Sequence, residues 1–253
     1  MHMIETLEQL ADWRNACQGR LGFVPTMGAM HPGHVSLMDL TRPHCEHLIV
    51  SIFVNPTQFN ESSDFQHYPR TFETDSQVCQ AAGVDAIFSP PVEVVYPTDE
   101  LEVAVDVPQL TGDLEGRFRP GHFQGVCRVV AKLFNMVQPD VAAFGRKDYQ
   151  QLAVIRAMTR GLAMPIEILP GETIRESDGL AMSSRNRRLD DDQRKAALSL
   201  SKALRQGVDM IEQQGEVEPA AVESAMNEIM TIYGVDVDYA VVRHPHTLGP
   251  LDC

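Results

Sequence analysis

The segment that decides the fold is Val24-Pro25-Thr26-Met27-Gly28-Ala29-Met30-His31-Pro32-Gly33-His34. It follows a short apolar run at 21–24 that is typical of a strand. It leads into a helical pattern at 34–40, which ends before Pro43 because proline does not fit inside a helix. Gly28 and Gly33 let the backbone approach a ligand without a Cβ in the way. A helix N-terminus offers free N–H groups and a positive dipole end to phosphate. This strand–loop–helix order predicts an α/β fold with an anion site at the loop.

His31 and His34 add chemistry to this loop. Their spacing of three places two imidazoles on one side of the turn, where they can donate hydrogen bonds to phosphate oxygens as charge builds at phosphorus. The alternative is a tight turn with incidental histidines. Function is favoured because two histidines, two glycines and the strand–loop–helix context agree. The His-x-Gly-His pattern is shared by a broad group of enzymes that activate substrates on the α-phosphate of a nucleotide, so it indicates the reaction type and not the substrate.

Strand-like and helical patterns alternate outward from this segment over the first two-thirds of the chain. The strand candidates are 21–24, 48–54, 84–88, 141–144 and 166–169, and the helix candidates are 34–40, 73–82, 123–137 and 149–162. The run 48–54 is nearly all apolar or β-branched, as in a parallel strand buried on both faces. The alternation predicts a Rossmann-like, doubly wound parallel sheet, with ligands beyond the carboxyl ends of its strands.

The pattern changes near Glu172, and we expect two domains, 1–174 for nucleotide binding and a small α+β domain at 175–253. Residues 190–214 predict an amphipathic helix, 219–233 a second helix, and 235–243 an antiparallel strand. The apolar stripe of the first of these helices consists of Ala197, Leu200, Leu204, Val208 and Ile211. The acidic run 190–192 suits the positive end of that helix better than a metal site.

The composition excludes several classes of protein. The chain has 253 residues, 22% of them charged and 43% hydrophobic, so bulk disorder is excluded. Its net charge of −14 argues against a nucleic-acid partner, although a local positive pocket can still take anionic substrates. Five cysteines without a C-x-x-C pair predict reduced thiols. With no membrane-length apolar run and no signal-like start, we expect a cytoplasmic protein without a membrane partner.

Two further loops carry polar groups suited to substrates. Asn55 and Gln58 follow the run 48–54, and their amides suit a small substrate with hydroxyl and carboxylate groups, although Asn-Pro is also a turn signal. In the segment 144–151, Lys147 can bridge nucleotide phosphates, and Gln151 lies one helical turn later on the same face. Asp148 serves either as a helix N-cap or, less strongly indicated, in holding nucleotide or Mg²⁺.

The segment 175–186 holds Ser183 and Ser184 beside Arg185, which fits a loop that grips phosphate. Composition alone favours a Ser-rich interdomain turn, whereas the position at the predicted boundary indicates a lid that closes over a triphosphate. A local basic patch consists of Arg117, Arg119 and His122. Whether it borders the anionic site or pairs with carboxylates of a partner subunit is left open by the sequence.

Together, these segments resemble the pantothenate synthetase (pantoate–β-alanine ligase) family over about 21–251. The shared motifs, in family order, are the segment 25–34, Ser-Ile-Phe-Val-Asn-Pro-x-Gln-Phe at 51–59, Tyr-Pro-Arg at 68–70, Arg-Pro-Gly-His-Phe at 119–123, Lys-Leu-Phe-Asn at 132–135, Lys-Asp-x-Gln-Gln at 147–151, and Asp-Gly-Leu-Ala-x-Ser-Ser-Arg-Asn at 178–186. The resemblance implies ligation of pantoate to β-alanine with ATP, through a pantoyl adenylate, with release of pyrophosphate and AMP. It also implies Mg²⁺ with the triphosphate, a homodimer, and a C-terminal domain that acts as a lid.

The resemblance also assigns site residues. Catalysis is assigned to His34, His31 and Lys147. The ATP-binding positions are Met27, Gly28, Ala29, Met30, His31, Pro32, Gly33, His34, Gly145, Arg146, Lys147, Asp148, Ile174, Met182, Ser183, Ser184 and Arg185. The positions for pantoate and β-alanine are Gln58, Gln151, Pro25, Thr26 and Asn55. No metal ligand is assigned.

The chain departs from the family pattern in three places. Arg146 stands where glutamate is common, and Arg128 where a small hydroxyl residue is common. The chain ends at Cys253, whereas most members continue with roughly two further strands, so we expect a shortened C-terminal domain.

Three other functions are alternatives to the ligase activity that the resemblance implies. The nearest is another His-x-Gly-His nucleotidyltransferase, such as one that makes a dinucleotide cofactor. A class I aminoacyl-tRNA synthetase would need a broad basic face, which a charge of −14 disfavours. A catalytically dead binding protein is disfavoured by intact His31, His34, Lys147 and Arg185.

Overall fold

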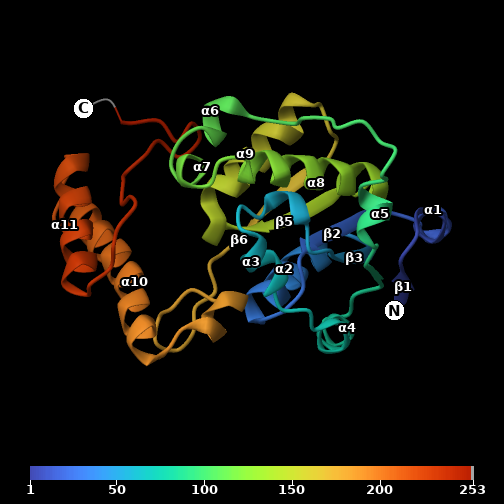
Figure 1. Ribbon diagram of the computed structural model, residues 1–253, viewed down its shortest axis with the longest axis horizontal. Helices are drawn as coiled ribbons and strands as arrows, with labels where there is room; N and C mark the ends of the chain where they lie inside the picture. Colours follow the sequence, from blue (N-terminus) through green and yellow to red (C-terminus); the bar gives the residue numbers. More distant parts are fainter. Residues whose placement is uncertain (252–253) are drawn as a thin grey trace. The chain divides into compact units, whose positions relative to one another are not determined.

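The computed structural model describes residues 1–251 (Figure 1). The chain divides into two compact units, Met1–Thr173 and Ile174–Cys253, and each is considered by itself. Within residues 1–251, no helix is both long and apolar enough to cross a membrane.

A six-stranded parallel sheet forms the centre of the first unit, in the order β1-β4-β3-β2-β5-β6. The strands are β1 (His2–Ile4), β2 (Leu21–Thr26), β3 (His47–Ile52), β4 (Ala86–Phe88), β5 (Val141–Gly145) and β6 (Glu167–Gly171). The parallel sheet predicted from the sequence is confirmed. The strand order reverses at β2, because β3 lies on one side of it and β5 on the other. Ligands of such sheets bind outside the carboxyl ends of the strands at this reversal.

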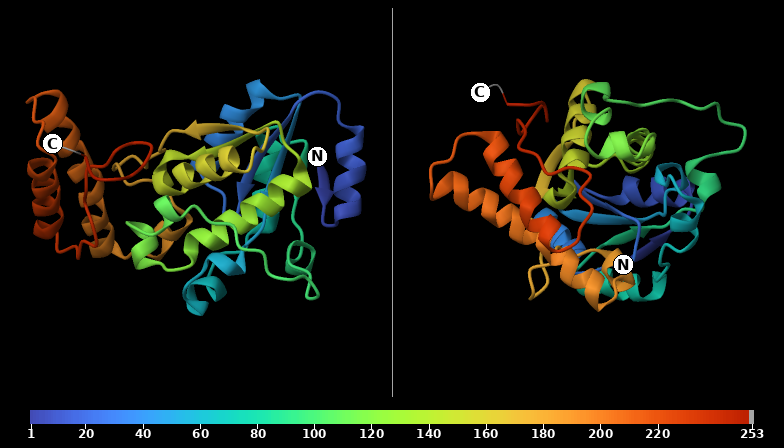
Figure 2. Two further views of the ribbon diagram at one scale, coloured as in Figure 1. Left: turned by 90° about the horizontal axis from the view of Figure 1, so that it is seen from above. Right: turned by 60° about the vertical axis from the view of Figure 1, so that its left-hand side comes forward.

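Helices cover both faces of the sheet (Figures 1 and 2). The helices of this unit are α1 (Leu7–Ala16), α2 (Pro32–Thr41), α3 (Ser62–Gln66), α4 (Phe72–Ala81), α5 (Val92–Val95), α6 (Pro108–Thr111), α7 (Glu115–Phe118), α8 (His122–Val137) and α9 (Tyr149–Gly161). Short 3₁₀ turns occupy η1 (Arg42–His44), η2 (Pro56–Gln58) and η3 (Arg146–Asp148). The central strands are buried on both faces, so Phe23, Val24 and Val50 are inaccessible to solvent, as the apolar runs predict.

The first strand and the first helix were not predicted from the sequence. β1 has only three residues, and two of them are exposed. The start of α1 nevertheless carries a capping box, in which Gln9 N–H donates to Thr6 Oγ1 and Thr6 N–H donates to Gln9 Oε1. A Thr-x-x-Gln pattern is a sequence signal for such a start.

The second unit consists mainly of α10 (Asp191–Glu212) and α11 (Pro219–Ile232), with a short 3₁₀ turn, η4 (Ser184–Arg188), before them. Asp190 caps α10 by accepting hydrogen bonds from Asp192 N–H and Gln193 N–H, which confirms the capping role predicted for the acidic run. The two helices pack through small residues. Ala203 is buried, and a Cβ on Gly207 would lie 3.1 Å from Met226 Sδ, so the helices approach closely.

The predicted apolar stripe of α10 is not the face that packs. Leu200, Leu204, Val208 and Ile211 are each about half exposed, at 47–55%. The periodicity identified an apolar stripe correctly, but small residues on the neighbouring face allow the closer approach to α11.

The strand predicted at 235–243 is also not formed. Among residues 174–251, the only bridge is the isolated antiparallel pair Arg175 and Ala181. Val235, Val237 and Val242 do pack on the α10–α11 core, but Val242 N–H donates to Glu223 Oε1 at 2.8 Å instead of to a neighbouring strand. A strand needs a hydrogen-bonded partner, and none is present here. The described part of this unit is helical rather than α+β.

Candidate active site

Three of the predicted motifs emerge at the same edge of the sheet. β2 ends at Thr26, β3 ends at Ile52, and β5 ends at Gly145. Because these strands are parallel neighbours, the loops that begin at residues 27, 53 and 146 leave the sheet side by side. The first unit therefore places the loops that carry Met27–His34, Asn55, Gln58 and 145–148 at one edge of the sheet.

The loop after β2 is held by a buried carboxylate that was not predicted from the sequence. Asp75 of α4 is 1% exposed, and it accepts hydrogen bonds from Ala29 N–H at 2.9 Å and Met30 N–H at 2.8 Å. Gly28 has a φ of +82°, and a Cβ there would lie 2.9 Å from Asp75 Oδ2. Thr26 Oγ1 donates to Ser51 O and accepts from Gly28 N–H. The loop is therefore fixed before any ligand binds.

His31 and His34 lie against each other at the start of α2. Their ring centroids are 4.1 Å apart, with an angle of 36° between the planes. His31 is the N-cap residue, and its Nδ1 accepts from Gly33 N–H at 3.1 Å. His34 Nδ1 accepts from His31 N–H at 3.3 Å. Because each Nδ1 accepts a hydrogen bond, a neutral ring at either position carries its proton on Nε2 and presents an N–H donor there.

His34 is held in the neutral form. Burial, followed by the nearby charges of His31 and Lys147, lowers the pKa of His34 to about 3. At neutral pH the ring is therefore a hydrogen-bond donor through Nε2 and not an imidazolium. The influence of Lys147 on this pKa also indicates that the β5 loop lies near the β2 loop.

Asn55 lies at the centre of a saturated hydrogen-bond network. It is 1% exposed, and its Oδ1 accepts from Tyr96 Oη–H and Thr57 Oγ1–H, each at 2.9 Å. Its Nδ2 donates to Gln58 Oε1 at 2.9 Å and to Gly125 O at 3.2 Å. Hydroxyl donors at one end and carbonyl acceptors at the other fix the orientation of this amide.

The network in turn orients Gln58. Since Gln58 Oε1 accepts from Asn55, its Nε2 is the donor end of the amide, and it donates to Met27 Sδ of the β2 loop at 3.4 Å. The backbone is fixed as well, because Gln58 O lies 2.9 Å from His122 Nδ1. The half-buried Gln58 amide therefore presents N–H donors beside the loop that holds the two histidines.

Tyr96 connects this network to α8. The Arg128 guanidinium carbon lies 4.9 Å from the centre of the Tyr96 ring, and Lys132 Nζ lies 5.7 Å from it. Burial raises the pKa of the Tyr96 hydroxyl, so it stays protonated and donates to Asn55. Arg128 is one of the two residues that the sequence analysis set apart from the family pattern, and here it packs on an aromatic ring.

The loop after β5 carries exposed charges. Lys147 Nζ lies 3.4 Å from Asp148 Oδ1, and Arg146 Nη1 lies 3.1 Å from Glu172 Oε1. Asp148 stands at the N-cap position of α9, but its side chain makes no capping hydrogen bond, so the capping interpretation is wrong. The next residue but one, Gln150, binds Leu110 O and Asp113 O and is structural.

The remaining predicted residues lie in the second unit. Residues 174–182 form a tight hairpin in which Met182 N–H donates to Ile174 O at 2.9 Å, so two predicted nucleotide contacts are neighbours. Ser183 Oγ caps η4 by accepting from Arg185 N–H at 3.3 Å. Arg194 of α10 binds the hairpin at Glu176 Oε2 and Asp178 Oδ2, both at 2.6 Å.

The basic patch predicted at 117–122 is not one surface. Arg119 pairs with Glu115 within its own turn. His122 is 8% exposed and binds the backbone of Gln58, and burial lowers the pKa of His122. His122 therefore supports the Gln58 loop.

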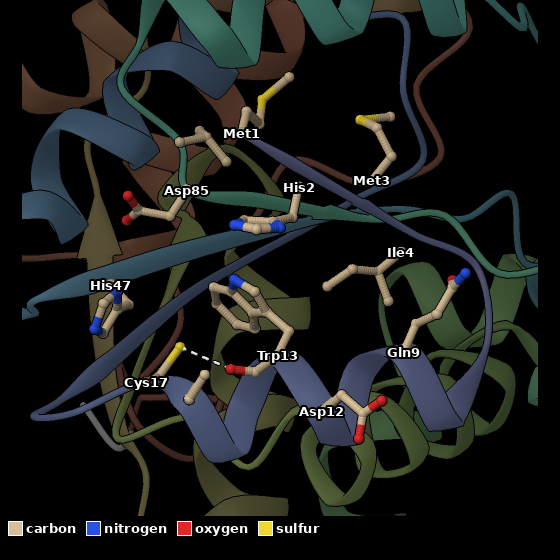
Figure 3. A pocket seen from close by; sticks show the side chains of 12 residues that line it. Met1, His2, Met3, Ile4, Gln9, Asp12, Trp13, Cys17, His47 and Asp85 are labelled. Carbon is tan, nitrogen blue, oxygen red and sulfur yellow. Dashed lines mark hydrogen bonds between the residues drawn. The ribbon is translucent and has the colours of Figure 1, made fainter.

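A separate cavity of about 710 Å³ lies against β1 and α1 (Figure 3). His2, Trp13 and His47 line it, together with Cys17, whose Sγ–H donates to Trp13 O at 3.3 Å. Of its two acidic groups, Asp12 and Asp85, the second is bound by Arg42 at 2.8 Å. None of the predicted site residues lines this cavity. Within residues 1–251, no cluster of three or more His, Cys, Asp or Glu side chains is arranged to hold a metal ion.

Known proteins of one family match almost the whole chain. The family profile described as Pantoate-beta-alanine ligase matches residues 1–252. A protein named pantothenate synthetase from Xanthomonas euvesicatoria pv. vesicatoria is 48% identical over 99% of this chain and 91% of its own length. One of the same name from Moorella thermoacetica is 47% identical over 100% of this chain and 90% of its own.

Solved structures give the same result. The crystal structure of pantothenate synthetase from Thermus thermophilus has a TM-score of 0.92 and 44% identity, over 99% of this chain and 90% of that one. The pantoate-beta-alanine ligase from Francisella tularensis, complexed with beta-gamma ATP and beta-alanine, has a TM-score of 0.79 and 34% identity. That match covers 90% of this chain and 86% of the other.

Proposed function

Because this chain belongs to the pantoate–β-alanine ligase family, we propose that it condenses pantoate with β-alanine at the expense of ATP, in the synthesis of coenzyme A. The proposal for the site rests on two imidazoles at the N-terminus of α2 whose Nδ1 atoms accept backbone hydrogen bonds, in the loop that Gln58 contacts at Met27. The match over the full length favours this ligase over another His-x-Gly-His nucleotidyltransferase, which would share the motif but not the rest of the chain.

In the first step, the pantoate carboxylate attacks the α-phosphorus of ATP and pyrophosphate leaves. A free carboxylate is a poor electrophile, and its adenylate is a good one. We assign His31 and His34 to donate hydrogen bonds to the phosphate oxygens as negative charge grows there. Lys147 adds a positive charge that neither histidine supplies, since His34 is neutral. Catalysis then depends on positioning and electrostatics, and not on a proton held by the protein.

In the second step, the β-alanine amine attacks the carbonyl of the adenylate and AMP leaves. We propose that Gln58 Nε2 and Gln151 bind the hydroxyl and carboxylate groups of pantoate. Asn55 and Thr26, which were predicted as direct contacts, are assigned instead to positioning, because their polar atoms are already bound within the protein. Pro25 is retained as a packing contact to the substrate.

The nucleotide is proposed to lie along the β2 loop from Met27 to His34 and at the β5 loop from Gly145 to Asp148. From the second unit we propose Ile174 and Met182 for the base, and Ser183, Ser184 and Arg185 for the phosphates, with this unit acting as a lid. Because the described residues offer no cluster for a resident metal, Mg²⁺ is proposed to enter bound to the triphosphate of ATP. We further propose a homodimer that works in the cytoplasm, where ATP is supplied.

The test is release of pyrophosphate by the purified protein. We expect pyrophosphate with ATP, Mg²⁺ and pantoate, and AMP with pantothenate once β-alanine is added. A rival nucleotidyltransferase would release no pyrophosphate in response to pantoate. If pantoate fails to release pyrophosphate from ATP, the proposed function is wrong.

A further inference from the structure

The hairpin at 174–182 is held closed by hydrogen bonds of its own. Glu176 N–H donates to Leu180 O at 2.7 Å, and Gly179 N–H donates to Glu176 O at 2.8 Å. Asp178 Oδ1 accepts from Leu180 N–H at 3.1 Å, which closes the tip of the hairpin. The two residues proposed to bind the base form the last pair of the hairpin, at its open end. The conformation of the hairpin therefore decides where they lie.

A single arginine of α10 fastens this hairpin to the helix. Arg194 Nη2 donates to Glu176 Oε2 and to Asp178 Oδ2, both at 2.6 Å, and Arg194 Nε donates to Asp178 Oδ2 at 2.9 Å. The three side chains are only 30–32% exposed, so water screens these contacts in part. A Cβ on Gly179 would lie 3.4 Å from Ser201 Oγ, so the tip of the hairpin also lies close to α10. One guanidinium thus holds two carboxylates of the hairpin.

One of these carboxylates also connects Arg194 to η4, the turn that carries the proposed phosphate contacts. Glu176 Oε1 accepts from Asn186 Nδ2 at 2.7 Å, and Asn186 Nδ2 also donates to Ala181 O at 3.0 Å. Asn186 lies within η4 and follows Arg185 directly. The hydrogen bond from Asn186, followed by the one from Arg194, lowers the pKa of Glu176, so this carboxyl group is anionic at neutral pH. The base-binding and phosphate-binding segments are thus joined through one side chain.

Within residues 174–251, Arg194 is the only cation bound to either carboxylate of the hairpin. Arg175 and Arg205 bind backbone carbonyl groups instead. Without Arg194, the hairpin would hold two uncompensated negative charges next to the turn that is proposed to bind a triphosphate. Such charges would repel each other and the nucleotide. Arg194 therefore supplies both the hydrogen bonds that hold the hairpin and the charge that neutralises it.

We infer that Arg194 is a positioning residue for ATP, which fixes the hairpin 174–182 and η4 in one arrangement before the nucleotide binds. The inference rests on the proposed function, because the nucleotide contacts of these two segments are taken from it. Segments that are already ordered cost less conformational entropy when a ligand binds, so the affinity for the ligand is higher. Arg194 acts through Glu176, Asp178 and Asn186, and it does not touch ATP itself.

Arg194→Met tests this role, because it removes the charge and the hydrogen bonds and retains an unbranched side chain. The KM for ATP, and the Kd for ATP from calorimetry without pantoate, should rise about fivefold, the upper range for a partly exposed charge pair. The KM for pantoate should not change, since its proposed contacts lie in the first unit. Arg194→Lys retains a cation and should recover part of the affinity. Lys195→Met is the matched control, because Lys195 pairs with Asp192, which is 93% exposed, and should leave both KM values unchanged.

Glu176→Ala separates positioning from direct contact with the nucleotide. If Arg194 acts through Glu176, this variant should also raise the KM for ATP, and the double variant with Arg194→Met should be little worse than Arg194→Met alone. If Arg194 bound ATP directly, Glu176→Ala would release the guanidinium and would not raise the KM for ATP. An unchanged KM for ATP in Glu176→Ala therefore overturns the inference.

Hydrogen exchange without ATP measures the order of the hairpin independently of activity. In Arg194→Met, the amides of Glu176, Leu180 and Met182 should exchange faster than in the wild type, while the amides of α11 stay protected and show that the unit is folded. Unchanged exchange in the hairpin, an unchanged affinity for ATP in Arg194→Met, or an equal loss in Lys195→Met would each overturn the inference. Pyrophosphate release by the wild type is measured separately. A wild type that releases none with pantoate refutes the ligase, whereas exchange and calorimetry still decide the role of Arg194.

Discussion

The Tyr96 hydroxyl donates a 2.9 Å hydrogen bond to Asn55 Oδ1, and this bond joins the loop after β3 to the α5–α8 side of the domain. The Asn55 amide, held in one orientation by this bond, in turn orients Gln58, whose Oε1 accepts from Asn55 Nδ2 at 2.9 Å. The side chain proposed to bind pantoate is therefore oriented by a residue that need not touch the substrate itself.

Tyr96→Phe should weaken the use of pantoate more than the use of ATP. Removal of the hydroxyl leaves Asn55 Oδ1 with Thr57 alone, and one lost hydrogen bond of about 1 kcal/mol corresponds to roughly a fivefold rise in the KM for pantoate. Steady-state kinetics with each substrate varied in turn measure the effect. An unchanged KM for pantoate, or an equal rise for ATP, would contradict the positioning role of Tyr96.

Gln58→Ala should raise the KM for pantoate further than Tyr96→Phe, because it removes the proposed contact itself. The binding of ATP, followed by calorimetry without pantoate, should stay close to that of the wild type. If Gln58→Ala has the same KM for pantoate as the wild type, the assignment of Gln58 is wrong.

His34→Ala should lower the rate of adenylate formation by about 10²–10³, the usual cost of one lost donor to a developing oxyanion. His34→Gln retains an N–H donor and should recover part of the rate. Rapid-quench measurement of pyrophosphate in a single turnover isolates this step. Equal rates in the wild type and His34→Ala would refute the role.

The low pKa of His34 also predicts how stability depends on pH. The unfolded ring takes up a proton near its usual pKa of about 6.5, whereas the folded ring takes one up only near 3. Between these values the unfolded state binds more protons, so the contribution of His34 to stability is complete above about pH 6.5 and is lost as the pH falls toward 3. Urea unfolding of the wild type and His34→Gln at pH 7 and pH 5 should show a larger loss at pH 5 for the wild type.

Asp75→Ala should destabilise the protein, because two buried amides of the β2 loop lose their acceptor. Each unsatisfied group costs about 1–3 kcal/mol, so a loss of several kcal/mol in urea unfolding is expected, together with weaker binding of ATP. Glu73→Ala, on the exposed side of the same helix, should change neither property. A stable Asp75→Ala that binds ATP normally would show that the loop is fixed by other groups.

Local patterns predicted the parts of the site that depend on local structure. The parallel strands and the loops at 24–34, 53–59 and 144–151 follow from apolar runs and from glycine and proline signals close in sequence. Asp75 was missed because it reaches Ala29 over 46 residues, and Tyr96 was missed because its hydroxyl matters only through Asn55. A pattern on one helix does not show which neighbour the helix meets, so the apolar stripe of α10 did not identify Ala203 and Gly207 as the residues that pack on α11. The strand at 235–243 was predicted from the alternation of apolar and polar residues alone, whereas a strand also needs a neighbouring strand to hydrogen-bond with.

Gly125→Ala tests the whole network from the side of α8. A Cβ at this position would collide with Thr57 O and lie 2.9 Å from Gln58 N, so either α8 or the Asn55–Gln58 loop must shift. Overpacking of this kind costs about 1–3 kcal/mol and should displace Gln58, with a lower stability and a higher KM for pantoate. Gly161→Ala is the matched control, since a Cβ there meets no atom within 4 Å and a helical alanine is favoured over glycine.

Because Asn55 also donates to Gly125 O, the defect of Gly125→Ala should not add fully to that of Tyr96→Phe in the double variant. Full additivity of the two effects on the KM for pantoate would mean that Tyr96 and Gly125 position Gln58 independently.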